Sequence, residues 1–363
     1  MKITVVTRNL AAGGAERVIV QLLGEWSKEN TCSLILLNNE KDFYDVSPSV
    51  KVIRIGKKSN NPVLDKLFRY REVRKNVVKE KADVVLAMPE EIGIYVIPSM
   101  LFTHIPVVVS ERNNPWIMPN KKITRLLRKV FYPFASGLIF QTKGAASFFS
   151  RRIQEKGIIL PNPLDISRLP DPYHGERRKI IVGAGRLERQ KNFSLLIEAF
   201  SDFYNKNKDY ELHIFGNGSM KQDLTELSDK LLPKGKVKLL GNNPDLLNKI
   251  KDCAIFVLSS DYEGVPNVLI EAMSIGMPVI STDCAPGGAR ELISNNENGL
   301  LIETNNRTQL ALAMDKLAKN KQLAEKFSQN APKIKFDLAS DIVASKWISY
   351  LKQIVGNKND IEK

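Results

Sequence analysis

Short apolar segments alternate with longer amphipathic segments along most of this chain, and this pattern strongly constrains the fold. Strands are predicted at residues 2–7, 32–37, 51–55, 84–87, 107–110, 137–141, 179–183, 211–215, 237–240, 254–259, 278–281 and 299–302. Most of them are separated by a segment of helical length, such as residues 15–29 or 193–205. Repeated strand–helix units with continuous apolar strands are typical of α/β proteins whose parallel sheets are covered on both faces.

A proline-rich interruption at residues 160–173 divides this pattern into two arrays. The chain has 363 residues, whereas a single hydrophobic core rarely grows beyond about 250–300 residues. We therefore predict two α/β domains, residues 1–165 and 166–337, which face each other across a ligand-binding cleft. The amphipathic tail, about 338–363, is predicted to be a helix that packs back towards the first domain.

The net charge of +14 is concentrated in the first half of the chain, because residues 1–170 carry +12 of it. This surplus favours an anionic partner such as nucleic acid, a phosphate-bearing substrate or a membrane surface. The three cysteines and three histidines show no disulfide or metal-ligand spacing, which favours a reducing compartment and no metal site. The N-terminal apolar run is too short for a signal peptide.

Residues 92–110 contain no Asp, Glu, Lys or Arg and are long enough to cross a membrane. Pro98 and Pro106 interrupt this stretch, and several polar residues dilute it. We therefore predict a buried helix followed by the buried strand at 107–110, rather than a membrane span.

The segment GAGRLERQKN, residues 183–192, directly follows a predicted strand. Its glycines allow a tight turn beside a ligand, and Arg186 and Lys191 place a guanidinium fork and a point charge at the strand's carboxyl end. Such a pair suits a diphosphate. The alternative is a simple strand–helix turn with two solvated cations.

The segment DYEGVPNVLIEA, residues 261–272, follows another predicted strand. Pro266 is expected in the first turn of a helix, with Glu263 in the preceding loop and Glu271 inside the helix. The free N–H groups of that first turn could hold a phosphate, and the two carboxylates suit hydroxyl groups on either side of it. The alternative is that both are ordinary surface acids.

A third glycine loop, NLAAGGAER at residues 9–17, precedes the first predicted helix and contains Gly13 and Gly14. Similar turns occur at residues 215–218 and 283–291. None of these segments has the G-x-G-x-x-G spacing of a dinucleotide-binding loop. Together they place glycine-rich turns at the carboxyl ends of several strands, where a cleft is lined.

The spacing Glu263-x7-Glu271, combined with Arg186, Lys191 and the Gly13–Gly14 loop, resembles the retaining GT-B glycosyltransferases of family 4 over essentially the whole chain. Residues 9–21, the segment SERNNP at 110–115 and the run 125–140 resemble a narrower set. Those enzymes extend lipid-diphosphate-linked oligosaccharides in bacterial glycan assembly, and N-acetylgalactosamine transferases are among them. The resemblance implies a GT-B fold, in which an N-terminal acceptor-binding and a C-terminal donor-binding Rossmann-like domain face each other.

The resemblance also implies individual roles. Arg186 and Lys191 correspond to the pair that grips the donor diphosphate, and Glu271 to the residue that binds the ribose hydroxyls. Glu263 corresponds to the residue that holds hydroxyls of the transferred sugar, so Arg186, Lys191 and Glu263 are the expected catalytic residues. The other residues expected at the donor are Gly13, Gly14, Gly185, Gly264, Val265, Pro266 and Asn267.

The implied reaction is transfer of a hexose or N-acetylhexosamine from a nucleotide sugar, with uridine as the expected base, to a glycan on polyprenyl diphosphate, with retention at the anomeric carbon. No cofactor or metal is expected. The implied setting is bacterial surface polysaccharide synthesis, with a cytoplasmic enzyme at the inner face of the cell membrane. Many relatives carry a histidine where this chain has Arg112, which leaves Glu111 and Arg112 as acceptor-side candidates.

Two basic segments are expected to be helices of the first domain. Residues 66–81 include Lys66, Arg69 and Arg74, which are candidates for the acceptor diphosphate. Residues 121–134 combine an apolar face with a basic face, the composition of a helix that lies on an anionic bilayer. Its membrane candidates are Arg125, Arg128 and Lys129. The alternative is a solvated helix packed on its own domain.

Three other functions were weighed. A nucleic-acid-binding protein would explain the charge, but no aromatic platform or recognition motif is present, and no nucleic-acid partner is expected. An oxidoreductase is disfavoured by the missing dinucleotide fingerprint. A non-catalytic relative would not need all of Arg186, Lys191, Glu263 and Glu271.

Overall fold

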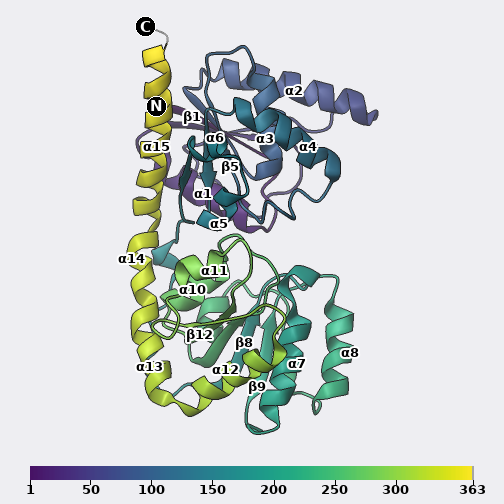
Figure 1. The fold of residues 1–363 in the computed structure, drawn as a ribbon. Helices are drawn as coiled ribbons and strands as arrows, with labels where there is room; N and C mark the ends of the chain where they lie inside the picture. Colours follow the sequence, from purple (N-terminus) through teal and green to yellow (C-terminus); the bar gives the residue numbers. More distant parts are fainter. Residues whose placement is uncertain (362–363) are drawn as a thin grey trace. The chain divides into compact units, whose positions relative to one another are not determined.

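The protein is described by a computed structural model in which the backbone is placed for residues 1–361 and side chains for residues 1–357. It forms two compact units, Met1–Pro163 with Leu338–Lys363, and Leu164–Asp337. The sequence had suggested a boundary at residue 165, and the last two residues of the predicted C-terminal segment lie outside the described residues. Both units combine helices with a parallel sheet (Figure 1).

The sheet of the first unit has seven strands in the order β3-β2-β1-β4-β5-β6-β7, and all neighbours run parallel. Its strands are β1 (Lys2–Thr7), β2 (Thr31–Leu36), β3 (Lys51–Arg54), β4 (Val84–Ala87), β5 (Val107–Ser110), β6 (Gly137–Phe140) and β7 (Gly157–Ile159). The sequence analysis missed β7, because its three residues are too short to show a pattern just before the proline-rich segment. The central strands are buried on both faces, as the apolar runs predicted.

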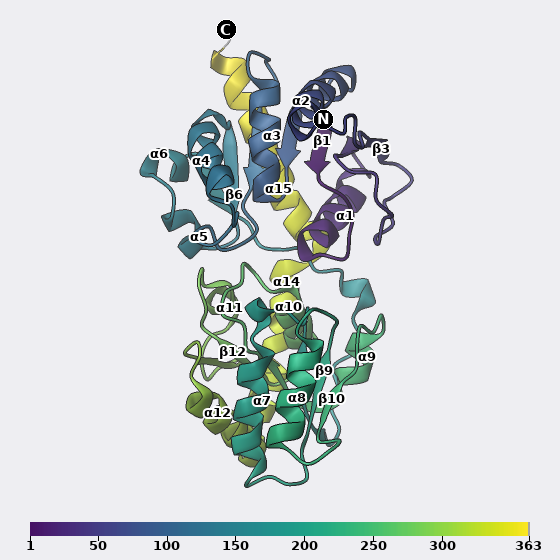
Figure 2. The same cartoon turned by 90° about the vertical axis from the view of Figure 1, so that its right-hand side faces the viewer.

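Helices cover both faces of this sheet. The first unit contains α1 (Gly14–Trp26), α2 (Pro62–Lys79), α3 (Glu90–Met100), α4 (Lys122–Phe131), η1 (Tyr132–Phe134), α5 (Lys143–Ser147), α6 (Arg151–Gln154) and α15 (Ser340–Ile361). One core joins α1 and α15 to the sheet, and a second joins α2 and α3 to its other face. In Figure 2, α2, α3 and α4 lie side by side in one layer, in agreement with the packing of α3 against both α2 and α4.

The predicted buried helix and strand at residues 92–110 correspond to α3 and β5. Within residues 1–361, no helix has the length and apolar character needed to cross a membrane.

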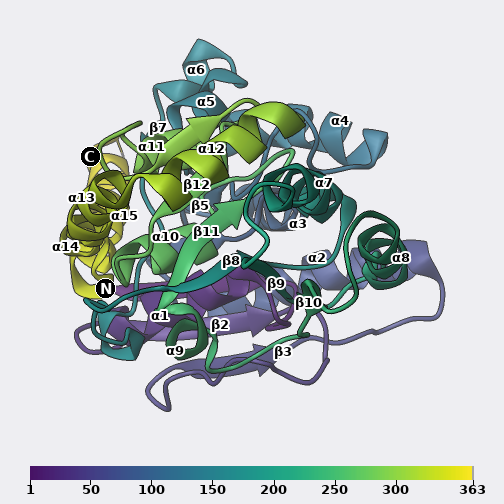
Figure 3. The ribbon, with the colours of Figure 1, turned by 90° about the horizontal axis from the view of Figure 1, so that it is seen from below.

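The sheet of the second unit has six parallel strands in the order β10-β9-β8-β11-β12-β13 (Figure 3). Its strands are β8 (Arg178–Ala184), β9 (Glu211–Phe215), β10 (Val237–Leu239), β11 (Cys253–Leu258), β12 (Val279–Thr282) and β13 (Leu300–Ile302). Since parallel strands end at the same edge of a sheet, the loops after β8, β9, β11 and β12 gather at one edge.

The helices of the second unit divide between the two faces of its sheet. They are η2 (Ile166–Arg168), η3 (Arg189–Lys191), α7 (Phe193–Tyr204), α8 (Lys221–Leu231), α9 (Leu246–Ile250), α10 (Asn267–Ser274), α11 (Gly288–Leu292), α12 (Arg307–Lys319), α13 (Lys321–Asn330), η4 (Ala331–Lys333) and α14 (Ile334–Leu338). One core packs α7, α8 and α12 on the sheet, and the other packs α9, α10 and α11.

Candidate active site

Two loops at the carboxyl edge of the second sheet are tied together. The loop after β8 runs through η3, and the loop after β11 leads into α10. The backbone N–H of Asp261 donates to the carbonyl of Gln190 at 2.9 Å, and Gln190 Nε2 donates to the carbonyl of Tyr262 at 2.9 Å. Ser259 Oγ donates to the carbonyl of Lys191 at 2.9 Å. These bonds fix the two predicted motifs next to each other.

An ion pair joins the two motifs. Lys191 Nζ donates to Glu263 Oε1, and the side chains are only 13% and 10% exposed. Ser260 Oγ donates to the same carboxylate oxygen at 2.9 Å. A cation and a carboxylate with little solvent around them interact strongly with each other and with any charged group that enters. The structure therefore brings together two of the three predicted catalytic residues.

Glycines are required where these loops approach each other. Gly185 has φ +152°, and a Cβ there would lie 3.0 Å from Cε of Lys191. Gly216, which follows β9, has φ +139°, and a Cβ there would lie 1.8 Å from the carbonyl oxygen of Gly185. A side chain at either position would push against the segment that carries Lys191.

The loop after β12 supports the other side of the pair. The backbone N–H of Glu263 donates to the carbonyl of Ala285 at 3.1 Å. A Cβ at Gly288 would lie 1.6 Å from the carbonyl oxygen of Gly264. Cys284 lies buried in the same loop, and burial, aided by the nearby Glu263 carboxylate, raises the pKa of its thiol to about 12. Cys284 is therefore a packing residue rather than a reactive thiol.

Helix α10 begins directly after this loop. Pro266 is its N-cap rather than a residue of the first turn, and it offers no side-chain cap. The side chain of Pro266 therefore accepts no hydrogen bond from the first backbone N–H groups of α10. Glu271 is buried within α10, while Val265 and Gly264 are buried just before it. Arg186 is exposed, and its Nη2 donates to Oε1 of Gln190 over a long distance of 3.4 Å.

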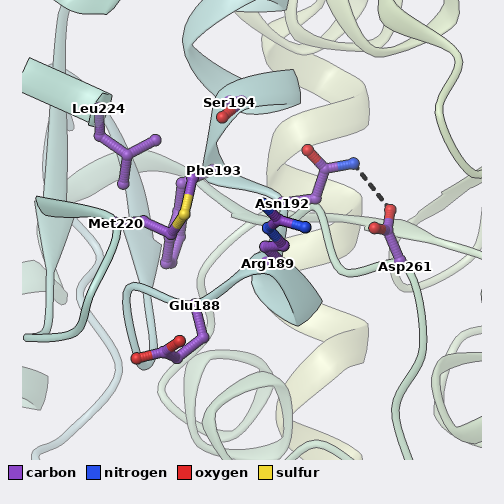
Figure 4. A pocket seen from close by; sticks show the side chains of 8 residues that line it. All are labelled: Glu188, Arg189, Asn192, Phe193, Ser194, Met220, Leu224 and Asp261. Carbon is purple, nitrogen blue, oxygen red and sulfur yellow. Dashed lines mark hydrogen bonds between the residues drawn. The ribbon is translucent and has the colours of Figure 1, made fainter. Parts of the chain in front are cut away.

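A separate cavity of about 220 Å³ lies beside η3, at the start of α7 (Figure 4). It is lined by Glu188, Arg189, Asn192, Phe193, Ser194, Met220, Leu224 and Asp261. Asn192 has φ +45°, caps α7 through Leu195 N at 3.1 Å, and donates to Oδ1 of Asp261 at 2.7 Å. None of the predicted site residues lines this cavity. The cavity is linked to the site by the hydrogen bond from Asn192 to Asp261, which anchors η3.

In the first unit, the predicted Gly13–Gly14 loop follows β1. Gly13 is the N-cap of α1, Gly14 is its first residue, and the hydroxyl of Tyr44 donates to the carbonyl of Gly13 at 3.2 Å. A Cβ at Gly13 would overlap the carboxylate of Glu16. The predicted loop therefore lies at the carboxyl edge of this sheet, directly before α1.

Glu111 lies in a buried polar cluster at the end of β5. Its Oε1 accepts the hydroxyl of Tyr132 at 2.6 Å, and its Oε2 lies 3.8 Å from Nη1 of Arg128. Burial, together with the nearby Glu90 carboxylate, raises the pKa of Glu111 to about 8, and the Arg128 charge and the Tyr132 bond only partly oppose this. Glu111 is therefore largely protonated at neutral pH.

Arg112, the next residue, is also held in place. Its Nη2 donates to Oδ1 of Asn162, which also accepts from Nε2 of Gln141 at 2.8 Å. Its guanidinium carbon lies 5.7 Å from the ring centre of Trp347. Burial lowers the pKa of Arg112 to about 10, although the Glu90 carboxylate opposes the shift. Arg112 thus remains a cation at neutral pH.

We expect Glu111→Gln to change how stability depends on pH. Because the pKa is raised in the folded state, the folded protein holds a proton that the unfolded chain has released. The stabilisation is complete below the unfolded pKa of about 4.3 and is lost as pH rises towards 8, at up to about 1.4 kcal/mol per pH unit. Urea unfolding between pH 5 and about 8 should show a flatter profile for the variant.

The exposed Glu155→Gln change, next to Arg151 in α6, provides the control and should leave the profile unaltered. Equal slopes for Glu111→Gln and the unmodified protein would show that Glu111 is ionised in the folded state.

Several predicted contact residues are already occupied by structural bonds. Arg74 donates to the carbonyls of Ser99 and Leu101 at the end of α3, near the amino end of β5. These two bonds orient the exposed Arg74 towards the end of α3, and its predicted role at the acceptor stays a prediction. Arg69 bonds to Asp65 and Asn38, whereas Lys66 is exposed.

The prediction for α4 needs correction. Arg128 is buried and donates to the carbonyls of Met118 and Pro115 at 2.8 and 2.7 Å. Arg125 bonds to the carbonyls of Ile117 and Pro119. Arg128 cannot meet a lipid headgroup from this position, and only Lys129 of the three candidates is fully exposed.

The sequence analysis missed the residues that support the candidate site. Ser259, Ser260 and Gln190 hold the Lys191–Glu263 pair, and Asn162 holds Arg112. The serines directly follow β11. Their position at the carboxyl end of a strand could have identified them as candidate site residues. Among the side chains placed for residues 1–357, no group of three His, Cys, Asp or Glu is arranged to hold a metal ion.

Comparison with known proteins identifies related families. Residues 170–334, most of the second unit, match the family model "Glycosyl transferases group 1". The chain is 26% identical to a Campylobacter jejuni α-1,4-N-acetyl-D-galactosaminyltransferase named for a GalNAc-GalNAc-diNAcBac-PP-undecaprenol acceptor, over 98% of this chain and 99% of that protein.

A second Campylobacter jejuni protein, N-acetylgalactosamine-N,N'-diacetylbacillosaminyl-diphospho-undecaprenol 4-α-N-acetylgalactosaminyltransferase, is 27% identical over 91% of this chain and 93% of its own length. Among solved structures, Anabaena Alr3699/HepE in complex with UDP aligns with a TM-score of 0.82 and 18% identity, over 97% of this chain and 100% of that one. The latter similarity concerns the fold, and it confirms the predicted GT-B architecture.

Proposed function

Because this chain is a GT-B glycosyltransferase with a group 1 domain, we propose that it transfers a hexose or N-acetylhexosamine from a UDP-sugar to a glycan on polyprenyl diphosphate. The transfer retains the anomeric configuration and serves bacterial surface polysaccharide or glycan synthesis. The observation that carries the proposal is the Lys191–Glu263 pair, held on two joined loops, of which the one with Glu263 leads into α10.

The donor lies against the second unit. Lys191 and Arg186 bind its diphosphate, which suits the point charge of a lysine and the fork of an exposed arginine. The N–H groups at the start of α10 face the phosphates. Glu271 accepts hydrogen bonds from the ribose, and Glu263 from hydroxyls of the transferred sugar. The backbone of Gly185, Gly264, Val265, Pro266 and Asn267 lies beside the donor.

The reaction breaks the bond between the anomeric carbon and the diphosphate oxygen while the acceptor hydroxyl forms the new bond on the same face. Positive charge develops on the sugar ring and negative charge on the departing diphosphate. Lys191 and Arg186 stabilise that negative charge, which removes the need for a metal ion. The acceptor proton passes to the departing phosphate oxygen.

The acceptor class and the base rest on the relatives. Two relatives carry undecaprenyl-diphosphate glycans in their names, and a third is named for amylovoran biosynthesis. The solved structure of HepE holds UDP. Arg112, Glu111, Lys66 and Arg69 are the acceptor-side candidates of the first unit. An acceptor with a lipid tail places the enzyme at the inner face of the cell membrane.

A ligand panel tests the donor class. Thermal unfolding would be followed with UDP, GDP, ADP, NAD and several UDP-sugars at one salt concentration. Ligand at about 100 times its Kd stabilises the folded state by about 2.7 kcal/mol, so a rise in Tm with UDP compounds alone is expected. A rise with NAD alone would favour an oxidoreductase, and no rise with any nucleotide would contradict the proposed donor site.

Glu271→Ala should weaken UDP binding. The side chain is buried inside α10, and losing a hydrogen bond from ribose to a charged group costs about 1.5–3 kcal/mol. We therefore expect Kd for UDP to rise by about tenfold or more, measured by calorimetric titration. Inorganic pyrophosphate, which has no ribose, should bind the variant with the same affinity as the unmodified protein. Unchanged UDP affinity would remove the ribose role of Glu271.

A further inference from the structure

Helix α4 presents its apolar side chains to solvent. Ile123, Leu126 and Val130 are 58%, 56% and 49% exposed. Their spacing of three and four residues places them in one stripe along the helix. The sequence predicted a membrane-surface helix with Arg125, Arg128 and Lys129 as its contacts, whereas in the structure Arg128 is buried and the apolar stripe is exposed. A stripe of this kind on a soluble surface marks an interaction site.

The arginines of α4 are responsible for this orientation. Arg125 and Arg128 project on the opposite side of the helix and bond to carbonyls of the loop at residues 115–119. Arg128 also lies 4.7 and 5.4 Å from the ring centres of Phe148 and Phe149. These contacts fix the rotation of α4 about its axis and leave the apolar stripe facing out.

Lysines border the stripe. Lys122 and Lys129 are exposed, and at about 100° per residue both lie on the same side of the line through Ile123, Leu126 and Val130. Lys121 is exposed at the helix start. Long lysine side chains can extend along an apolar surface and keep their charge in the polar layer above it. Apolar residues flanked by lysines are typical of a helix that lies in a membrane interface.

The same layer carries a second exposed apolar segment. The first two turns of α2 expose Val63, Leu64, Leu67 and Phe68, and Lys66 is exposed among them. Both α2 and α4 pack on α3, so their outer faces belong to one side of the first unit (Figure 2).

Both helices also reach the carboxyl edge of the sheet. Arg69 of α2 bonds to Asn38 just after β2 at 2.9 Å, and Arg128 of α4 lies beside Glu111 just after β5. The apolar segments therefore lie at the same edge of the unit as the acceptor-side candidates.

We propose that the outer face of α4, with the first two turns of α2, docks on an anionic lipid bilayer. Ile123, Leu126 and Val130 enter the boundary between headgroups and acyl chains, and Lys122 and Lys129 stay at the level of the lipid phosphates. A bilayer fits better than a second copy of the chain, because the lysines of two facing copies would repel each other. This inference rests on the proposed lipid-linked acceptor for its purpose, whereas the docking can be measured without any substrate.

The test is co-flotation of the full-length protein with vesicles of phosphatidylcholine that contain about one third phosphatidylglycerol. The double change Ile123→Asp and Leu126→Asp should lower the vesicle partition coefficient by at least about tenfold, because two apolar side chains no longer leave water. Leu312→Asp is the matched control, since Leu312 is 61% exposed on α12 of the second unit. It should bind vesicles as the unmodified protein does. UDP affinity should be the same in all three proteins.

A second variant separates the contribution of the lysine charges from that of the apolar stripe. Lys122→Gln with Lys129→Gln should lower partition on anionic vesicles by several-fold, and raised salt should reduce binding of the unmodified protein.

Full vesicle binding by the aspartate variant would overturn the proposal. So would a dimer of the unmodified protein that the aspartate change converts to monomer without altering vesicle binding. A protein that binds vesicles but not UDP would support the docking and contradict the proposed donor, so the two failures are distinguishable.

Discussion

Replacing Lys191 by alanine is expected to lower turnover by about two to three orders of magnitude, the effect of removing one group aimed at charge that develops in a transition state. The change also leaves the Glu263 carboxylate without its cation, since Lys191 Nζ and Glu263 Oε1 form an ion pair in a largely buried position. That uncompensated charge would lie where the donor diphosphate gains negative charge. Both effects oppose the reaction, so the loss should appear mainly in kcat.

Arg189→Ala is the control for this variant. Arg189 is an exposed cation on the same short helix η3, two residues away, and it lines the separate cavity beside α7. If Lys191 acts through its position, turnover of Arg189→Ala stays within about twofold of the unmodified enzyme, in the range of ordinary surface substitutions. Equal activity losses in the two variants would show that general positive charge matters, and full activity of Lys191→Ala would remove its diphosphate role.

The strand–helix order could be predicted from the sequence because buried parallel strands are apolar on both faces. β1, β4, β5 and β9 have the predicted bounds, and the other predicted strands differ from the observed ones by one residue at one or both ends. β7 could not be predicted, since its short apolar run is recognisable as a strand only from its pairing with β6. Its position depends on a contact between segments, and a local pattern carries no such information.

The orientation of α4 shows the same limit more clearly. Periodicity separates its apolar and basic faces but does not say which one is buried. The sequence therefore left two alternatives, a helix on an anionic bilayer and a solvated helix packed on its own domain. Here four backbone carbonyls of the 115–119 loop and the rings of Phe148 and Phe149 are the partners of the arginines. A buried arginine is stable when its donors are satisfied.

For the candidate site, the residue types predicted Lys191 and Glu263 as members of one site, but not that they pair. Their spacing of 72 residues becomes contact because β8 and β11 are neighbours in the sheet. The supporting roles of Ser259, Ser260 and Gln190 are visible only in that geometry. Their side chains bond to groups of the other loop or to Glu263. Serine and glutamine are common in loops, so no sequence pattern predicts such bonds.

Gly288→Ala is expected to damage the second unit and the proposed donor site together. An alanine Cβ would lie 1.6 Å from the carbonyl oxygen of Gly264 and 3.0 Å from Cα of Val265. Backbone atoms cannot yield as a flexible side chain can, so either α11 or the loop before α10 must move. Overpacking of this kind costs about 1–3 kcal/mol, and we expect a loss of unfolding free energy at the upper end of this range in urea.

Gly24→Ala is the control, because Gly24 lies inside α1 and nothing lies within 4 Å of a Cβ there. Alanine is favoured over glycine in a helix by about 0.8–1 kcal/mol, so this variant should be as stable as the unmodified protein or more stable.

UDP titration then separates the two ways in which Gly288→Ala can be accommodated. If the Gly264–Val265 segment moves, the groups at the start of α10 and Glu263 leave their positions, and UDP affinity should fall by about tenfold or more, which corresponds to about 1.4 kcal/mol. If α11 moves instead, the protein loses stability but keeps its UDP affinity. The hydrogen bond from Glu263 N to the carbonyl of Ala285 favours the first result, because it ties the two loops together next to the Glu263 carboxylate. A variant that is fully stable and binds UDP normally would show that the close approach of Gly288 to Gly264 is not needed for the fold or for the donor site.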